Sequence, residues 1–293
     1  MRLPYILHPF YRYMRDVVPE PIKPTTRGLY NMANKFLTYG RADIFTALDM
    51  EINSDCNMRC SYCPISIEGR GATLMPEALF LKVLQDLSDF PYKGRISPHF
   101  YGEPTLDGRL VRLMQIARDR VPEASLVIHT NGTRLTRKLY RDLIKVGVDG
   151  FIITRHAPKW PTNVLDIVNN EADSKTFVRM HDFDGKVLFN RGGTVKPKLE
   201  RTLRRCFYLS DEIAITHDGE VVCTNDFHIT ESFGNVHTQH LLRDIWWSER
   251  FTKLRARLRN GHFDLDVCKK CSGVKESKSE PTTPIKILPF AAD

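Results

Sequence analysis

The sequence predicts an α/β fold in which parallel strands alternate with helices, followed by a smaller α+β domain. From residue 46 to about residue 199, short apolar runs alternate with amphipathic helical patterns. This alternation is typical of parallel strands joined by helical crossovers. About six such units fit, which indicates a partial (β/α)6 barrel rather than a closed barrel of eight. After residue 199 the pattern changes to a hairpin and a long helix.

The strands and helices of the first domain follow one another along the chain. Strands are predicted from short apolar runs and helices from apolar residues spaced three and four apart. Pro76 stands at the start of one helix, a favoured position for proline, and another helix stops near Gly147. The predicted strands are residues 47–52, 95–101, 125–129, 151–154, 176–180 and 187–190; the predicted helices are residues 76–90, 106–120 and 135–146.

The second domain is predicted from a hairpin and a helix. Asp218-Gly219 lies between two short strands, residues 213–216 and 220–223, and is a strong signal for a tight turn. Residues 241–259 carry apolar side chains at helical spacing and predict one helix. We therefore divide the chain into an N-terminal extension, a partial barrel, a second domain and a polar tail, at residues 1–45, 46–199, 200–275 and 276–293.

The chain carries a moderate positive charge. It has 293 residues, 42% of them hydrophobic, and a formal net charge of +8. This composition allows a sizeable core and favours anionic ligands without requiring one. The arginine-rich segment 250–259 lacks the interleaved aromatic residues of a nucleic-acid surface, so we expect no nucleic-acid partner.

The seven cysteines fall into two sets. Cys56, Cys60 and Cys63 form a C-x3-C-x2-C loop directly after the first predicted strand. Three thiolates would hold three irons of a cubic 4Fe–4S cluster and leave the fourth iron open to a small molecule. The second set lies in the second domain and would saturate its own cluster; it comprises Cys206, Cys223, Cys268 and Cys271.

Disulfides and zinc are the competing interpretations of these cysteines. An odd number of cysteines, with no secretory leader and no transmembrane run, argues against disulfides and favours a reducing cytoplasm. Zinc stays open for the second set, because C-x2-C with two distant cysteines is also a zinc pattern. The first set makes iron–sulfur the favoured interpretation for both.

The C-x3-C-x2-C loop resembles the signature of the radical S-adenosylmethionine (SAM) enzymes. Tyr62 precedes the third cysteine, where this family has an aromatic residue near the adenine. Tyr101-Gly102-Glu103-Pro104 resembles the G-G-E-P element that holds the methionine amino group, with Tyr101 in place of the first glycine. The resemblance implies that SAM chelates the open iron and is cleaved by one electron to methionine and a 5′-deoxyadenosyl radical, which abstracts hydrogen from substrate.

Further predicted SAM contacts follow the strands. Thr130 and Asn131 come after one strand, and Arg155 ends another and is predicted to contact the SAM carboxylate. The second domain resembles the C-terminal auxiliary-cluster domain of the superfamily. Four cysteines there imply its short form (twitch), with one auxiliary 4Fe–4S cluster, rather than the longer two-cluster form (SPASM). The segments that carry this likeness are Asp218-Gly219, Gly234-Asn235-Val236 and Asp244-Ile245-Trp246.

A more specific likeness is carried by the spacing of the four auxiliary cysteines and by five segments: Gly94-Arg95-Ile96-Ser97, His99-Phe100-Tyr101-Gly102-Glu103-Pro104, Thr130-Asn131-Gly132, His156-Ala157 and Asn190-Arg191-Gly192-Gly193. In these features, over roughly residues 46–273, the chain resembles the twitch-type radical SAM dehydrogenases that oxidise the aminocyclitol 2-deoxy-scyllo-inosamine. This resemblance implies that Tyr101 and Arg191 contact substrate hydroxyls and that Arg191 helps to take the hydroxyl proton. Two predicted substrate contacts depart from the pattern: His129 replaces a tyrosine, and Asn225 replaces a glutamate near the substrate amine. Because an amide cannot pair with an ammonium as a carboxylate does, we expect a polyol or sugar without that amine.

The predicted reaction is oxidation of a secondary alcohol of a cyclitol or sugar-like substrate to a ketone. The auxiliary cluster would accept the second electron, and a flavodoxin or ferredoxin-type protein would supply the first. One alternative is a radical SAM maturase that modifies a peptide, although the first forty residues are short for a peptide-recognition domain. The other is an epimerase, which is disfavoured because no cysteine is left to return a hydrogen atom.

The N-terminal stretch is dense in apolar and aromatic residues. Two interpretations stay open for it: contact with a membrane surface, or packing against the barrel, since short isolated helices are marginal without burial. Pro4 and Pro9 argue against one continuous helix. The residues concerned are Leu3, Tyr5, Ile6, Leu7, Phe10, Tyr11 and Tyr13.

Overall fold

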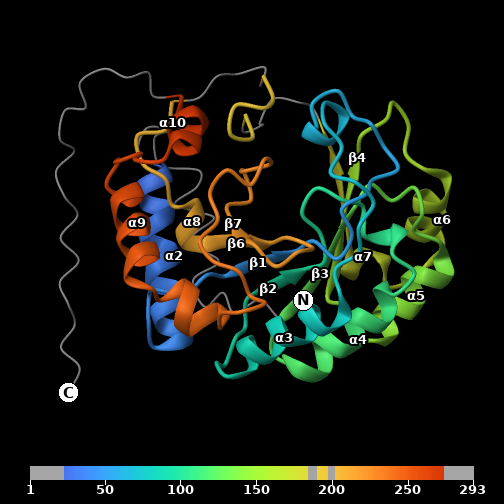
Figure 1. Ribbon diagram of the computed structural model, residues 1–293. Helices are drawn as coiled ribbons and strands as arrows, with labels where there is room; N and C mark the ends of the chain where they lie inside the picture. Colours follow the sequence, from blue (N-terminus) through green and yellow to red (C-terminus); the bar gives the residue numbers. More distant parts are fainter. Residues whose placement is uncertain (1–22, 184–189, 197–201, 274–293) are drawn as a thin grey trace.

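The structure is a computed structural model that describes residues 23–183, 190–196 and 202–273 (Figure 1). Its centre is a sheet with strand order β5-β4-β3-β2-β1-β6-β7. Neighbouring strands are parallel throughout, except that β6 and β7 are antiparallel. The strands are β1 (Ala47–Met50), β2 (Arg95–Ser97), β3 (Ser125–Thr130), β4 (Gly150–Arg155), β5 (Val178–Asp182), β6 (Glu212–Ile215) and β7 (Val221–Val222). The predicted α/β fold with a parallel sheet is confirmed.

Helices connect the parallel strands and cover their outer face (Figure 1). The crossovers are α3 (Glu77–Ser88), α4 (Leu110–Arg120), α5 (Arg137–Lys145) and the pair α6 (Thr162–Asn170) and α7 (Ser174–Phe177). The remaining helical elements are α2 (Lys23–Tyr39), α8 (Tyr208–Asp211), η3 (Leu241–Trp246), α9 (Glu249–Arg259) and α10 (Asp266–Ser272), with 3₁₀ turns η1 (Pro64–Ser66) and η2 (Pro104–Leu106).

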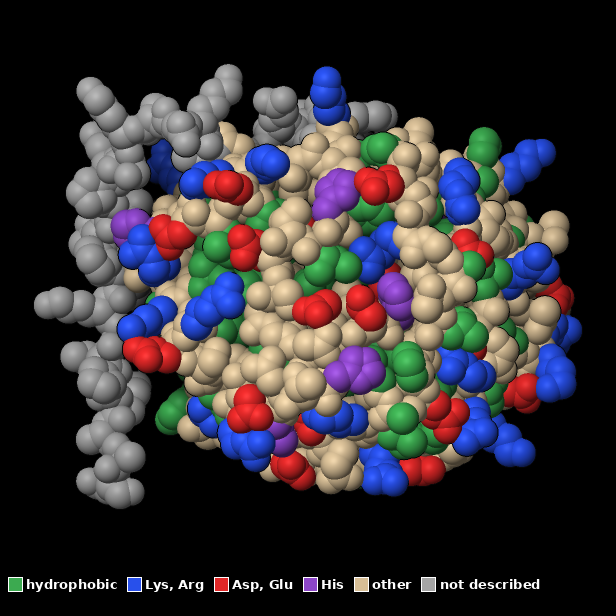
Figure 2. All heavy atoms as spheres, in the orientation of Figure 1, with side chains coloured by type: hydrophobic (Ala, Val, Ile, Leu, Met, Phe, Trp, Pro, Cys, Tyr) green, Lys and Arg blue, Asp and Glu red, His purple; other side chains and the backbone are tan. Residues whose placement is uncertain are grey.

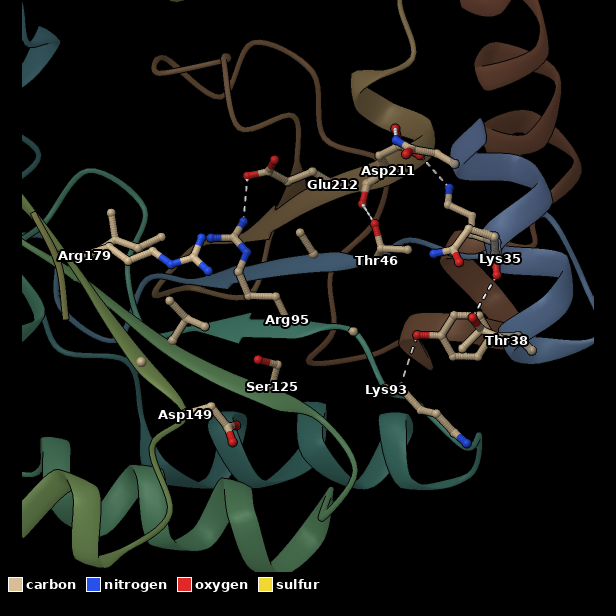
Figure 3. A pocket seen from close by; sticks show the side chains of 18 of the residues that line it. Lys35, Thr38, Thr46, Lys93, Arg95, Ser125, Asp149, Arg179, Asp211 and Glu212 are labelled. Atoms are coloured by element: carbon tan, nitrogen blue, oxygen red, sulfur yellow. Dashed lines mark hydrogen bonds and ion pairs between the residues drawn. The ribbon is translucent and has the colours of Figure 1, made fainter. Parts of the chain in front are cut away.

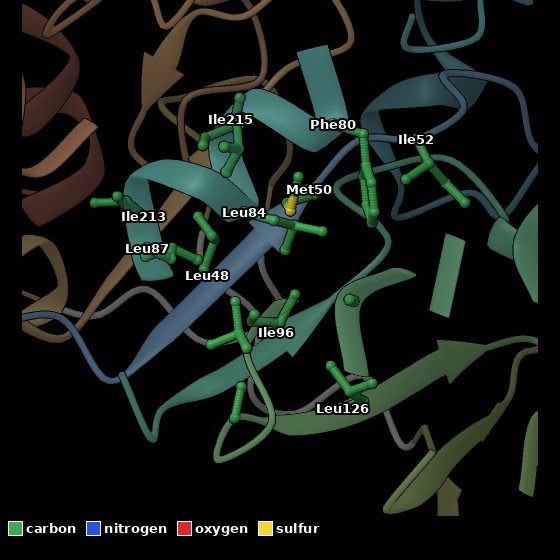
Figure 4. Close-up of a cluster of buried hydrophobic side chains, with 14 of the residues drawn as sticks. Leu48, Met50, Ile52, Phe80, Leu84, Leu87, Ile96, Leu126, Ile213 and Ile215 are labelled. Atoms are coloured by element: carbon green, nitrogen blue, oxygen red, sulfur yellow. The ribbon is translucent and has the colours of Figure 1, made fainter. Parts of the chain in front are cut away.

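The main core lies between the sheet and the crossover helices. Leu48 and Met50 of β1 pack against Phe80 and Leu84 of α3, and all four are fully or almost fully buried (Figure 4). Burial of such side chains is the dominant favourable term in folding. Side chains alternate along a strand, so the residues between them face the inner side of the barrel, where several are polar.

The prediction of one continuous helix over residues 241–259 is wrong, because the structure has two helical elements there. A π-helical turn, η3, ends at Trp246, and α9 begins after Ser248, whose hydroxyl accepts from Phe251 N. An N-cap serine satisfies a helix-terminal N–H and so favours a new start there. The strand predicted over residues 95–101 is shorter in the structure and ends at Ser97, because Pro98 has no N–H to donate to a ladder.

Helix α2, from the predicted N-terminal extension, packs beside α8 and α9 (Figure 1). Lys35 of α2 is buried and forms an ion pair with Asp211, with 2.6 Å between Nζ and Oδ1. Asp43 pairs with the fully buried Arg255 of α9 at 2.8 Å, and its carbonyl accepts from the Trp246 and Trp247 indoles. The described part of the segment before the first strand, residues 23–46, therefore packs on the rest of the fold.

Some predictions fall on residues outside the described ranges. They are the aromatic N-terminal stretch within residues 1–22, most of the strand predicted over residues 187–190, and the polar tail. Among the residues that are described, no helix combines the length and the apolar character needed to cross a membrane.

We predict that Asp43→Ala lowers the free energy of unfolding by about 2 kcal/mol, because it leaves the buried Arg255 guanidinium without its carboxylate. Chemical denaturation measures this change. Asp264→Ala is the control: it removes an exposed ion pair with Arg257 and is expected to cost less than about 1 kcal/mol. Equal losses in the two variants would contradict the structural role assigned to Asp43.

Candidate active site

The first cysteine loop is fastened to the Gly102-Glu103 turn after β2. Glu103 N donates to Asp55 O at 2.7 Å, and Asn53 Nδ2 donates to Glu103 O at 3.1 Å. A Cβ on Gly102 would lie 2.0 Å from Asn53 O, a distance no side chain tolerates. Glycine is therefore required for the loop and the turn to meet.

The Glu103 carboxylate joins this turn to the end of β3. Its Oε1 accepts from Thr130 Oγ1 at 2.6 Å, and its Oε2 accepts from Asn131 N at 2.8 Å. Asn131 in turn donates from Nδ2 to Asn57 Oδ1, within the cysteine loop, at 3.0 Å. The predicted SAM contacts Glu103, Thr130 and Asn131 thus form one connected group at the carboxyl edge of the sheet.

The three cysteines of the loop are surrounded by groups that stabilise thiolates. Cys56 Sγ accepts from Met58 N at 3.5 Å, and Cys63 accepts from the Ile65 backbone. Tyr62 bonds to Cys60 and to the His156 ring, and stacks on Phe183 with 4.0 Å between ring centroids. Burial raises the pKa of all three thiols, an effect that bound iron would reverse, since a coordinating thiol is deprotonated.

The four cysteines of the second set line one cavity between β7, α9 and α10. Three of them accept backbone N–H groups: Cys206 from Tyr208, Cys223 from Asn225 and Cys271 from Gly192. Such hydrogen bonds to sulfur orient ligands and tune the potential of iron–sulfur clusters. The donor set therefore fits a buried cluster.

All seven cysteines are free thiols. Within the described ranges, no three His, Cys, Asp or Glu side chains converge on one point as the ligands of a single metal ion would. A cubic cluster binds each cysteine to a different iron, so its ligands surround a volume rather than a point. The cavity of the second set has this arrangement.

Arg191 lies between the two cysteine sets. It has a φ of 52° and precedes two further positive-φ residues, Gly192 and Gly193. A non-glycine residue in this region is strained, and such strain concentrates at functional sites. The charge of Arg191 acts on the thiols of both Cys63 and Cys271, which places its guanidinium within electrostatic reach of both sets.

The residues predicted to contact substrate meet around Arg191. Its Nη1 donates to Asn225 Oδ1 at 2.8 Å, and its guanidinium lies 5.5 Å from the centroid of the Tyr101 ring. The Tyr101 hydroxyl donates to Thr224 O at 3.1 Å, and Phe227 packs edge-on against its ring. Three of the four predicted substrate contacts, Tyr101, Arg191 and Asn225, are therefore neighbours in the structure.

His129 and Arg155 have other partners. His129 accepts from Arg95 Nη1 at 2.7 Å and stacks on His99 with 4.6 Å between ring centroids. Arg155 donates to Asp182 Oδ1 at 2.6 Å and to two carbonyls of the loop after β4. Their roles toward substrate and SAM stay predictions.

Sequence reasoning missed a polar group on the inner face of the barrel. It comprises Asp49, Arg95, His99 and Glu212. Arg95 and His99 contact His129, and Arg95 also contacts Asp49 at 3.2 Å and Glu212 at 3.1 Å. The signal was present, since Asp49, Arg95 and Glu212 are charged residues inside otherwise apolar strands. The pairing of β1 with β6, which brings Asp49 near Glu212, had no local signal.

Together the parallel sheet, the three-cysteine loop after β1 and the second cysteine set define a radical SAM enzyme with an auxiliary cluster domain. The Radical SAM superfamily model matches residues 50–182, and the SPASM iron–sulfur cluster-binding domain model matches residues 206–272. The second match favours iron–sulfur over zinc for the second set. The predicted cofactors, SAM and 4Fe–4S clusters, are confirmed at the level of the family.

The chain is 35% identical over 244 residues to the S-adenosyl-L-methionine-dependent 2-deoxy-scyllo-inosamine dehydrogenase of Niallia circulans, covering 81% of this chain and 96% of that protein. It is similar to the crystal structure of BtrN in complex with AdoMet and 2-DOIA, with a TM-score of 0.72 and 33% identity over 81% of this chain and 97% of that one. An open conformation of BtrN gives a TM-score of 0.62 and 32% identity, over 78% of this chain and 92% of that one. The chain belongs to this family of radical SAM dehydrogenases.

We predict that Gly102→Ala disrupts the first cluster, because the added Cβ forces the cysteine loop away from the turn. Iron in the anaerobically reconstituted protein should fall from about eight to about four per chain. Addition of SAM should no longer change the electron paramagnetic resonance spectrum of the reduced protein. Gly108→Ala is the matched control, because nothing lies within 4 Å of its added Cβ. Full iron content and an intact SAM response in Gly102→Ala would contradict the prediction.

Proposed function

We propose that this protein oxidises a secondary alcohol of a cyclitol or sugar-like substrate to a ketone. The position of Arg191 carries the proposal. One guanidinium, beside Tyr101 and Asn225, acts electrostatically on thiols of both cysteine sets. A substrate bound there is adjacent to a hydrogen-atom acceptor on one side and an electron acceptor on the other. The identity to a cyclitol dehydrogenase along 96% of that relative supports the same reaction class.

When bound, SAM and the two clusters supply the hydrogen-atom acceptor and the electron acceptor of this oxidation. For SAM, we propose contacts by residues that line the carboxyl edge of the sheet. Tyr62 would lie against the adenine, and Arg155 would contact the SAM carboxylate. The remaining proposed contacts are Gly102, Glu103, Pro104, Thr130 and Asn131.

Arg191 would hold the reacting hydroxyl. Its guanidinium is a poor base, since its pKa in water is above about 12. Burial opposes the charge of Arg191, but electrostatic interaction with Tyr101 and with the cysteines outweighs it and raises the pKa of Arg191. Arg191 therefore stays charged and donates hydrogen bonds to the substrate oxygen, with Tyr101 packed beside it.

Asn225 would set the substrate preference. Its Oδ1 already accepts from Arg191, so its Nδ2 donors are the groups left for substrate. Two N–H donors suit a hydroxyl or ether oxygen and repel an ammonium. The proposed substrate is therefore a polyol or sugar that lacks an amine at this position.

The partners and compartment are part of the same proposal. A flavodoxin or ferredoxin-type protein is the proposed source of the first electron, because a one-electron reduction initiates the reaction. Seven free thiols in one chain suit a reducing compartment, and we place the enzyme in the cytoplasm. Of the two interpretations of the N-terminal stretch, we propose packing against the fold, because the adjoining α2 packs in this way.

The anaerobic reaction tests the function directly. With SAM, a reductant and a panel of cyclitols and sugars, we expect one ketone per 5′-deoxyadenosine and per methionine released. Ketone formation is detected by mass spectrometry after reaction with a hydrazine. An epimerised alcohol, or 5′-deoxyadenosine without ketone from every polyol, would contradict the proposed oxidation.

We predict that Asn225→Glu shifts the preference toward aminated cyclitols about tenfold in kcat/KM, because a carboxylate forms a charge-assisted hydrogen bond with the ammonium. Competition between matched aminated and non-aminated substrates measures this ratio. Asn170→Glu adds the same charge at the exposed end of α6, and should leave the ratio unchanged. A preference of the wild-type enzyme for the aminated substrate would contradict the role proposed for Asn225.

A further inference from the structure

The inner face of the barrel holds a connected group of ionisable side chains that the proposed function does not yet use. Asp49 comes from β1, Arg95 from β2, His99 from the loop after β2, and Glu212 from β6. Burying charged groups is costly unless they are paired. A connected set of four ionisable side chains inside the barrel therefore calls for a function.

Asp49 and Glu212 meet at Arg95, whose Nη2 lies 3.2 Å from Asp49 Oδ1 and 3.1 Å from Glu212 Oε1. The register of β1 and β6 explains the contact, because Ala47 pairs with Glu212 and Asp49 with Ala214, which places both carboxyls on the inner face. Two buried carboxyl groups held beside the same guanidinium nitrogen repel one another when both are ionised, which favours retention of one proton by the pair. Burial, followed by the charge of Asp49, raises the pKa of Glu212 to about 8, and burial raises the pKa of Asp49 as well, so the pair retains a proton at neutral pH.

His99 extends this pair toward the substrate site. Its Nδ1 lies 3.8 Å from Asp49 Oδ1, and both atoms are buried without a hydrogen-bond partner. The His99 side chain is 20% exposed, so part of the ring stays accessible. The charge of Arg191 acts on both His99 and Asp49, which places them within electrostatic reach of the substrate-binding residues.

Arg95 and His129 hold the group in place. Arg95 contacts Asp49 and Glu212 through Nη2, and donates from Nη1 to His129 Nε2. His129 stacks on His99 with an interplanar angle of 8°, which fixes the orientation of the His99 ring. Burial lowers the pKa of His99 to about 3, with the charges of Arg95 and Arg191 adding to the effect, so the ring stays neutral and must give up a proton at one nitrogen as it takes one at the other.

Glu212 reaches a cavity of about 510 Å³ at the amino ends of the strands, whereas the first cysteine loop follows the carboxyl end of β1 (Figure 3). Polar groups from Thr46, Ser125, Asp149 and Asp211 also line this cavity. Figure 2 shows charged side chains of both signs across one face of the molecule. A proton that leaves Glu212 thus enters a polar space at the far end of the barrel.

Oxidation of R₂CHOH to R₂C=O removes two electrons and two hydrogens. One hydrogen leaves the carbon with one electron, the second electron passes toward the auxiliary domain, and the hydroxyl hydrogen leaves as a proton. The charged Arg191 cannot take that proton. The proposed function therefore lacks a proton acceptor.

We propose that His99, Asp49 and Glu212 form a relay that carries the hydroxyl proton from the substrate to the cavity at the amino end of the barrel. This inference rests on the proposed function. The O–H bond of the substrate breaks as the C=O bond forms, and the proton moves to the His99 ring. A proton passes from His99 to Asp49, while the proton held by Glu212 is released to the cavity, so the relay ends with one proton exported and no electron gained.

Glu212→Gln tests the relay. The amide keeps a hydrogen-bond donor for Asp49 but cannot release a proton, so ketone formation should fall at least about tenfold while SAM binding and iron content stay unchanged. Asp49→Asn should have the same effect, and Glu212→Asp should restore part of the rate. Asp149→Asn is the matched control, because this carboxylate lines the same cavity but pairs with Arg118 outside the relay.

The difference between infrared spectra of the reconstituted holoenzyme in H₂O and in D₂O gives a readout that does not depend on turnover. A protonated-carboxyl band that shifts in D₂O should be present in the wild type and in Asp149→Asn, and absent in Glu212→Gln. Wild-type ketone rates in Glu212→Gln and Asp49→Asn, or the same band in Glu212→Gln, would overturn the relay. If the wild type makes no ketone from any polyol, the proposed function fails, and the infrared comparison still decides whether Glu212 holds the proton.

Discussion

The contact between Arg191 and Asn225 is the interaction on which the site depends. Arg191 belongs to a strained loop whose next residue, Gly192, donates to Cys271, whereas Asn225 donates its backbone N–H to Cys223. The side-chain hydrogen bond at 2.8 Å therefore joins two segments that each touch the second cysteine set. Tyr101 links the same guanidinium to the turn that fastens the first set. Through these contacts, the spacing between the two cysteine sets and the residues proposed to bind substrate is fixed by backbone geometry as well as by side chains.

The sheet explains why the chemistry collects at one end. Parallel strands bring their carboxyl ends to one edge, so the loop after β1, the turn after β2 and Thr130-Asn131 after β3 meet there. Apolar residues of these strands face the crossover helices and leave the intervening positions for polar side chains. The inner polar group at Asp49, Arg95 and Glu212 is a consequence of that alternation, and it connects the site to the opposite end of the barrel.

Much of this arrangement could be predicted from the sequence because its signals are local. The spacing of Cys56, Cys60 and Cys63, the Gly102-Glu103-Pro104 turn and the Asp218-Gly219 hairpin each depend on a few adjacent residues. The break between η3 and α9 was missed because Trp247 donates to Asp43 O, some two hundred residues away, and Ser248 caps the new helix. The packing of α2 against α8, and the pairing of Asp49 with Glu212, also depend on partners distant in the chain, which periodicity does not reveal.

Electron paramagnetic resonance of the reduced, reconstituted protein tests the central claim that two different cluster sites flank one substrate site. The account predicts two resolved 4Fe–4S signals. One of them should disappear in the triple variant Cys56→Ala, Cys60→Ala, Cys63→Ala, and SAM should change only that signal. The second signal should be insensitive to SAM. It should respond to a bound polyol, since Arg191, the proposed substrate contact, acts electrostatically on Cys271. A single cluster signal, or a SAM response that comes from the four-cysteine set, would contradict the account.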